Sequence, residues 1–189
     1  MKRRTFISTL GATIGSSVPA FSIVPRHILG GRNFSAPSDK LNVAAIGAGG
    51  KAWQNLNLTF KKGEANIISL CDVDDRMAEG SRKKWPEASY YKDFRQMLDK
   101  EDKNIDAVIV SSPDHMHAVH ALMAMKMGKH VYVEKPLTHD IQEARLLTEA
   151  AKKYKVVTQM GNQGSSGDDR RYVEKWIQDG VIGDVERVH

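Results

Sequence analysis

The sequence predicts an α/β protein built on a doubly wound parallel sheet. Two features lead to this prediction. Short apolar runs without polar alternation, such as Leu41–Ile46 and Ile105–Ser111, indicate strands that are buried on both faces. These runs alternate with segments whose apolar residues recur at helical spacing. Strands that alternate with helices form a parallel sheet with right-handed crossovers.

The predicted elements follow one another in a regular order from residue 41. We expect strands at 41–46, 65–71, 89–91, 105–111, 130–133 and 156–160. We expect helices at 52–62, 75–84, 93–98, 115–127 and 141–154. Together these elements predict one domain over residues 41–165.

The chain changes character after residue 165. Asp168–Gln178 has helical spacing, and Gly180–Gly183 turns the chain into the run Val185–His189. That run has the pattern of the first strand of a new sheet, but a single strand cannot satisfy its own backbone groups. Either it joins the edge of the existing sheet, or the chain is part of a longer protein. We favour the second interpretation, in which residues 166–189 begin a second, α+β domain.

The first forty residues predict an export signal followed by a linker. Lys2-Arg3-Arg4 precedes a weakly apolar stretch that reaches about Val24, and residues 25–39 contain glycines, prolines and serines. The paired arginines followed by Thr5-Phe6-Ile7 resemble a twin-arginine signal; an ordinary secretory leader is the alternative. The stretch is too short and too interrupted for a stable membrane anchor. We therefore expect a periplasmic or exported protein.

The distribution of charge argues against a nucleic-acid partner. The formal net charge of +5 lies in residues 1–40, which contain six basic residues and one acidic residue. The rest of the chain balances at 22 basic and 22 acidic residues, which leaves no basic stripe to bind a phosphate backbone. Cys71 is the single cysteine, so no intramolecular disulfide forms, and we interpret it as a small buried residue.

A glycine-rich turn follows the first predicted strand. It reads Gly47-Ala48-Gly49-Gly50-Lys51-Ala52, which fits the pattern G-x-G-x-x-A of dinucleotide-binding Rossmann folds. The first glycine permits a tight turn, the second lets the backbone approach a pyrophosphate, and Ala52 lets the helix pack closely. The helix then presents free amide groups and its positive dipole end to the phosphates. Glycine also marks ordinary turns, but the strand before and the helix after favour a dinucleotide.

An acidic residue lies where the ribose of a dinucleotide is expected. Asp72 ends the second predicted strand, 25 residues after Gly47, and can bind the hydroxyl groups of the adenosine ribose. A carboxylate there repels a 2′-phosphate, which favours NAD over NADP. The alternative is that Asp72 caps the next helix, although Asp74 fits that role better.

Two further motifs narrow the class of protein. Ser112-Pro113-Asp114-His115-Met116-His117 follows the fourth predicted strand, and Glu134-Lys135-Pro136-Leu137 follows the fifth. Both lie at the carboxyl ends of parallel strands, where open α/β sheets bind ligands. This pairing resembles the glucose–fructose oxidoreductase / inositol dehydrogenase / MocA (Gfo/Idh/MocA) family over residues 41–189. The resemblance implies an NAD(P)-dependent oxidoreductase that acts on a sugar or polyol.

The resemblance also implies roles for single residues. Three of them would line the cofactor near its nicotinamide end, namely Ser112, Pro113 and His117, and Asp114 would also bind the cofactor. Lys135 would be catalytic, because an ammonium group beside the substrate hydroxyl can stabilise the alkoxide that develops as hydride leaves; the alternative is a surface lysine before a proline turn. Glu134 would lie beside the cofactor, and Asn162 would bond to the cofactor or the substrate.

Three neighbouring histidines do not predict a metal site. His115 and His117 point in nearly opposite directions on a helix, and no carboxylate or cysteine completes a ligand set with His117 and His120. We therefore expect no metal and interpret His115 and His120 as ordinary helix residues.

The resemblance leaves three functions open. The first is a dehydrogenase, the second a glycosidase that uses bound NAD for transient oxidation of the sugar, and the third a non-catalytic NAD-binding subunit. The family takes its general acid/base from a second domain, and no equivalent occurs by His189. We expect this chain to bind NAD tightly but not to turn over alone, and the full-length protein to form a homo-oligomer around a small carbohydrate substrate.

Overall fold

The computed structural model describes residues 36, 39–61, 63–165 and 167–187. The predicted export signal falls on residues outside this described part. Among the described residues, no helix combines the length and the apolar character needed to cross a membrane.

A six-stranded sheet forms the centre of the fold, and all of its strand pairs are parallel. Its strands are β1 (Leu41–Ile46), β2 (Ala65–Cys71), β3 (Ser89–Tyr91), β4 (Ala107–Val110), β5 (His130–Glu134) and β6 (Thr158–Gly161). The spatial order is β3-β2-β1-β4-β5-β6, so the chain winds outward from β1 in one direction and then returns to wind outward in the other. This reversal between β1 and β4 creates the crevice where doubly wound sheets bind ligands.

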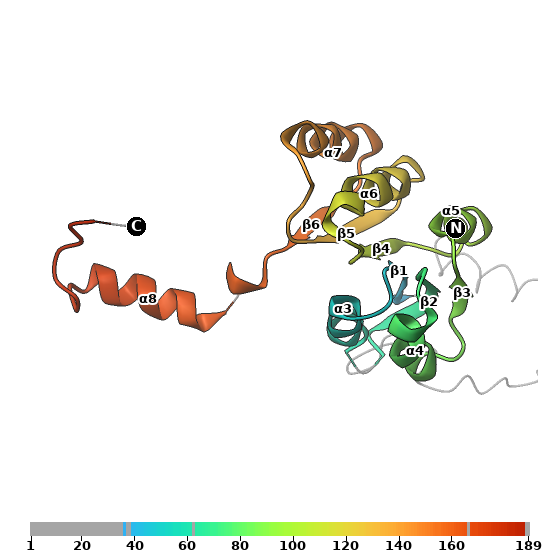
Figure 1. Ribbon diagram of the computed structural model, residues 1–189, viewed down its shortest axis with the longest axis horizontal. Helices are drawn as coiled ribbons and strands as arrows, with labels where there is room; N and C mark the ends of the chain where they lie inside the picture. The colour runs from blue at the N-terminus through green and yellow to red at the C-terminus, as the bar shows by residue number, and fades with distance from the viewer. Residues whose placement is uncertain (1–35, 37–38, 62, 166, 188–189) are drawn as a thin grey trace, which may run out of the picture. The chain divides into compact units, whose positions relative to one another are not determined.

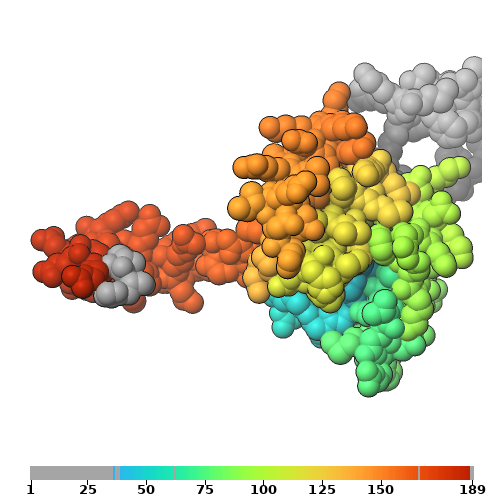
Figure 2. Space-filling model, turned by 45° about the horizontal axis from the view of Figure 1, so that its top comes forward, coloured from blue at the N-terminus to red at the C-terminus, as the bar shows by residue number. Residues whose placement is uncertain are grey.

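Helices cover both faces of the sheet, as predicted for a doubly wound fold (Figure 1). One face carries α3 (Lys51–Phe60) and α4 (Asp75–Lys84). The other carries α5 (Phe94–Lys100), α6 (His117–Lys126) and α7 (Ile141–Tyr154), and Figure 2 shows the atoms of α6 and α7 packed side by side.

Two apolar cores follow from this layering. In β1, Val43 and Ala45 pack into the core under α3 and α4, whereas Ala44 and Ile46 pack into the core under α5, α6 and α7. Both faces of the central strand are therefore apolar, which explains the run without alternation in its sequence. Burial of each such side chain contributes about 1–3 kcal/mol.

Aspartate side chains cap three helices at their N-termini. The carboxylates of Asp74, Asp93 and Asp140 accept hydrogen bonds from backbone amides in the first turns of α4, α5 and α7. The role expected of Asp74 as the cap of α4 is thus confirmed. Helix α3 differs, because Gly50 stands at its N-cap and no side chain bonds to its first turn.

Among the predicted boundaries that moved, two have a clear local cause. The strand expected at 105–111 is shorter, because the Ile105 amide donates to the Glu101 carbonyl at the end of α5. The helix expected from His115 begins at His117, since Asp114–Met116 forms a 3-10 turn (η2) in which Met116 N donates to Pro113 O.

The end of the chain contains the clearest difference from the predicted elements. The helix expected at Asp168–Gln178 is present as α8, and none of its residues is buried. The strand expected at Val185–His189 is not found: residues 185–187 form no strand, and 188–189 lie outside the described part. A strand needs a neighbour for its backbone groups, and the described residues supply none there. The assignment of residues 166–189 to a second domain stays a prediction.

Candidate functional site

A cleft lies at the carboxyl ends of β1, β2 and β4, where the strand order reverses. Its volume is about 660 Å³. Its lining includes the loop after β1, the residues that follow β2 and β3, and the loop that leads from β4 into α6. The polar and charged lining residues are Lys51, Asp72, Lys92, Arg95, Ser111, Ser112, His115 and His120.

The glycines after β1 make room for close neighbours. Gly47 has φ +83°, and a Cβ there would lie 2.6 Å from the carbonyl oxygen of Ser111. A Cβ on Gly49 would lie 2.5 Å from the carbonyl oxygen of Met77 in α4. The close neighbour that the structure shows at Gly49 is therefore the α4 backbone, whereas the sequence suggested a pyrophosphate. Larger residues at either position would separate the elements that form the cleft.

The N-terminus of α3 is open toward the cleft. The first turn of a helix has amide groups without an intrahelical partner. In α3 the Ala52 amide donates to the Gly49 carbonyl, and no side chain takes up the amides of the first turn. Gly49, Gly50 and Lys51 at this end all line the cleft. Free amides together with the positive end of the helix dipole are the donor set that binds a pyrophosphate. The residues present thus fit a dinucleotide.

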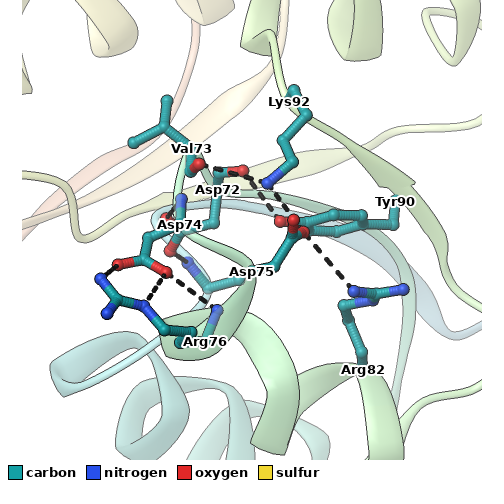
Figure 3. Close-up of polar contacts among 9 residues, drawn as sticks. Asp72, Val73, Asp74, Asp75, Arg76, Arg82, Tyr90 and Lys92 are labelled. Atoms are coloured by element: carbon teal, nitrogen blue, oxygen red, sulfur yellow. Dashed lines mark hydrogen bonds and ion pairs between the residues drawn. The ribbon is translucent and has the colours of Figure 1, made fainter.

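Asp72 connects the loops after β1 and β2 (Figure 3). Its Oδ2 accepts from the Ala48 amide at 2.8 Å, and its Oδ1 accepts from the Asp74 amide at 3.0 Å. Each carboxylate oxygen keeps a second lone pair, so the group can still accept from ribose hydroxyls. Asp72 lies in the cleft wall, which is where the sequence places a ribose-binding carboxylate.

A cluster of charged residues surrounds Asp72 on its β3 side (Figure 3). Lys92 Nζ lies 2.7 Å from Asp75 Oδ1 and donates to the Val73 carbonyl at 3.2 Å. The hydrogen bond from Lys92 lowers the pKa of Asp75, and the same contact raises the pKa of Lys92. Sequence reasoning did not identify Lys92, because it follows a short edge strand and belongs to no motif.

His120 and Ser112 form a polar pair in the wall of the cleft. Ser112 Oγ lies 2.9 Å from His120 Nδ1, and the Phe94 ring packs edge-on against the imidazole. Burial, together with the nearby positive charge of Arg95, lowers the pKa of His120 to about 4, so the ring is neutral at pH 7. His115 also lines the cleft. The sequence suggested that both are ordinary helix residues; His120 does lie in α6 and His115 in the 3-10 turn η2, but both line the cleft.

His117 connects the loops after β4 and β5. It is fully buried, with Nε2 at 2.8 Å from the Ser112 carbonyl and Nδ1 at 2.6 Å from the Pro136 carbonyl. In the described part of the chain it is not among the residues that line the cleft. His117 therefore acts here through the two loops that it holds together, and Ser112 and Pro113 form the cleft surface instead.

Glu134 is a buried carboxylate bound by neutral donors. Its Oε1 accepts from Asn55 Nδ2 at 2.7 Å and from Gln163 Nε2 at 2.6 Å, with the Tyr132 hydroxyl at 3.3 Å. Its Oε2 accepts from the Lys135 amide at 3.2 Å. These contacts join α3, the end of β5 and the turn after β6. A Cβ on Gly161 would lie 2.4 Å from the Tyr132 hydroxyl, which explains the glycine.

Lys135 and Asn162 lie at the same edge of the sheet, after β5 and β6. Both side chains are exposed, and neither residue lines the cleft in the described part. The Lys135–Pro136 peptide bond is cis. Asp114, the first residue of η2, is likewise exposed and outside the cleft lining. The cleft thus lies at the carboxyl ends of β1, β2 and β4, whereas Lys135 lies outside it, at the carboxyl end of β5.

Two further expectations concern metals and thiol chemistry. No group of three potential metal ligands comes together among the described residues. Burial, together with the neighbouring Asp72 carboxylate, raises the pKa of the Cys71 thiol to about 12. Cys71 is thus a protonated, buried side chain.

The fold agrees with comparisons to known proteins. Residues 41–162 match the GFO/IDH/MocA family, described as the oxidoreductase family with an NAD-binding Rossmann fold. The chain belongs to this family, as the sequence motifs predicted. It is also similar to a crystal structure of myo-inositol 2-dehydrogenase from Lactobacillus plantarum, with a TM-score of 0.67 and 26% identity, covering 77% of this chain and 43% of that one.

Two curated relatives have names that refer to carbohydrates. A glycosyl hydrolase family 109 protein of Shewanella sp. (strain W3-18-1) is 26% identical, covering 97% of this chain and 44% of the relative. D-glucoside 3-dehydrogenase of Escherichia coli (strain K12) is 29% identical, covering 78% of this chain and 42% of the relative. The chain therefore spans less than half the length of these relatives.

Proposed function

We propose that the protein is an NAD-dependent oxidoreductase that transfers hydride between nicotinamide and a hydroxyl or ketone of a sugar or polyol. The observation that carries this proposal is the cleft at the strand reversal, where the open N-terminus of α3 and the Asp72 carboxylate face the same space. The names of the inositol and glucoside dehydrogenases among the similar proteins support a carbohydrate substrate.

In this proposal, each part of a dinucleotide has residues that suit it. The pyrophosphate would lie on the amides at the start of α3, and the adenosine ribose on Asp72. The nicotinamide supplies the hydride acceptor when bound. Lys135, at the end of β5, would hydrogen-bond the reacting oxygen and stabilise its developing negative charge. His117 and Glu134 would position the loops that carry Ser112 and Lys135.

A preference for NAD over NADP is part of the proposal. A 2′-phosphate on the adenosine ribose would lie next to the Asp72 carboxylate, and the two negative charges would repel each other. Titration of both cofactors into the purified protein tests this: we expect the lower Kd for NAD and a smaller difference in Asp72→Ser. Equal affinities in the wild type would show that Asp72 does not face the ribose.

A second candidate function is an NAD-dependent glycosidase. It is favoured by the glycosyl hydrolase family 109 relative, whose alignment covers nearly the whole of this chain. The two reactions differ in their balance of cofactor, since transient oxidation and re-reduction leave no net NADH. With the full-length protein and a nitrophenyl glycoside, release of nitrophenol without net NADH would support the glycosidase, and net NADH from a free sugar the dehydrogenase.

A non-catalytic NAD-binding subunit is the third possibility. In this case candidate sugars would leave the absorbance spectrum of the bound cofactor unchanged. Reduction of bound NAD on addition of a sugar or polyol would exclude it, whichever of the two catalytic functions applies.

We also propose that the protein is exported by a twin-arginine signal. Its support is the Arg3-Arg4 pair followed by Thr5-Phe6-Ile7 in the sequence. Replacing both arginines by lysine keeps the charge, so an ordinary secretory leader would still function. We expect the doubly substituted protein to stay in the cytoplasm, folded and loaded with cofactor. Unimpaired export would favour the ordinary leader.

A further inference from the structure

Two cationic side chains lie near Asp72, the residue proposed to bind the ribose, and both pair with the Asp75 carboxylate. Asp75 Oδ1 lies 2.7 Å from Lys92 Nζ and 3.6 Å from Arg82 Nη1. The Arg82 guanidinium also lies over the Tyr90 ring, 4.4 Å from its centroid. Figure 3 shows these four side chains gathered next to Asp72. We call them the Asp75 cluster: Asp75, Arg82, Tyr90 and Lys92.

The cluster is attached directly to the backbone around Asp72. The Tyr90 hydroxyl donates to the Asp72 carbonyl at 2.9 Å, and Lys92 Nζ donates to the Val73 carbonyl at 3.2 Å. Lys92 and Asp72 both line the cleft. The ammonium group is therefore at the position from which it could pair with a phosphate on the ribose, but it is paired with Asp75 instead.

We propose that Asp75 is a specificity-determining residue, which disfavours NADP by holding Lys92 in an internal ion pair. This inference rests on the proposed NAD preference and adds a second source to it. Asp72 repels a 2′-phosphate directly. Asp75 removes the cation that would otherwise attract one, because an ammonium with its own carboxylate partner has little net charge to offer.

The alternative role of Asp75 is local to its helix. It is the first residue of α4, where an acidic side chain interacts favourably with the helix dipole. That role predicts a change in stability and none in cofactor choice. The two roles therefore differ in their readouts.

The experiment measures Kd for NAD and for NADP by calorimetry at low ionic strength. In Asp75→Asn we expect NADP to bind about three- to tenfold more tightly, the scale of one new charge-assisted contact at a partly solvated site, and NAD within about twofold. The gain should shrink as salt is added. Asp75→Ser serves as a second variant, and circular dichroism checks that both are folded.

Two further variants test whether the freed Lys92 ammonium causes the tighter binding of NADP. Asp75→Asn combined with Lys92→Gln should lose the gain, because the freed ammonium is gone. Glu79→Gln removes another carboxylate of α4, one that pairs with Lys83 away from the cleft, and should leave both Kd values unchanged. An unchanged Kd for NADP in both Asp75 variants would overturn the inference, and so would a gain that persists in the double variant.

The experiment distinguishes a failure of the proposed NAD preference from a failure of the proposed role of Asp75. If the wild type binds both cofactors equally while Asp75→Asn still tightens NADP, the preference is wrong and the role of Asp75 stands. If the wild type prefers NAD and neither Asp75 variant changes the ratio, Asp72 alone accounts for the preference.

Discussion

The ends of β2 and β5 present their charges in opposite ways. After β2, the carboxylates of Asp74 and Asp75 pair with Arg76 and Lys92 at the protein surface, within reach of solvent. After β5, Glu134 is buried and its partners are neutral amide and hydroxyl groups. Solvent screens the first set and not the second. We therefore expect substitutions after β2 to change ligand preference with little change in stability, and substitution of Glu134 to disturb the positions of the elements that it joins.

The largest effect should come from the β5 end and concern turnover. In the full-length protein, Lys135→Ala should lower kcat by roughly 10²–10⁴, the usual scale for one oxyanion-stabilising or acid–base group. NAD binding should stay within about tenfold, since the pyrophosphate site at α3 is untouched. Steady-state kinetics and a cofactor titration measure the two effects.

Lys135→Arg serves as the matched control for this substitution. It should not restore full activity, because a planar guanidinium has a different shape and does not release its proton. Near-normal turnover in Lys135→Ala would make this lysine a surface residue of the proline turn.

The next effect tests the buried carboxylate itself. Glu134→Ala removes the shorter of the two hydrogen bonds that Asn55 Nδ2 and Gln163 Nε2 each donate, and leaves them only Ser111 Oγ and the Tyr132 hydroxyl. We expect the free energy of unfolding to fall by about 2–4 kcal/mol, measured by denaturant titration. The control is Glu79→Ala on the exposed face of α4, which should change nothing measurable. Similar stability for the two variants would remove the contrast between buried and exposed carboxylates.

Much of the fold was predictable because it depends on local apolar pattern. The runs Leu41–Ile46 and Ala65–Cys71 are strands with the predicted bounds, since strands covered on both faces need no polar alternation. The motifs also gave the family. Boundaries were less predictable where a turn competes, as at Asp114–Met116.

The candidate site was predictable only where its residues belong to one short sequence motif. The loop from Gly47 and the carboxylate of Asp72 are local signals. The partners of Glu134 are not, because Asn55 and Gln163 are separated by over a hundred residues and meet only through the sheet. The place of His120 in the cleft wall depends on the 3-10 turn before α6, which no periodicity indicates.

A smaller effect should appear in the pH dependence of stability. His120 has an ordinary pKa of 6.5 when unfolded and about 4 in the fold, so between these values only the unfolded chain binds the proton. Its contribution to stability is complete above about pH 6.5 and is lost as the pH falls toward 4. His120→Asn, whose amide can face Ser112, should flatten the free energy of unfolding over this window. His139→Asn, at an exposed position, should leave the wild-type slope unchanged.

The smallest effect should come from the exposed charges beside β2. Asp75→Asn breaks the pair with Lys92, yet both side chains are largely solvated, and surface ion pairs contribute little to stability. Asp74 still caps α4, so the helix keeps its first turn. We expect thermal and denaturant unfolding midpoints within error of the wild type. A loss approaching that of Glu134→Ala would mean that the Asp75 cluster is a structural element of the fold, and the charges at the ends of β2 and β5 would then not differ in their contribution to stability.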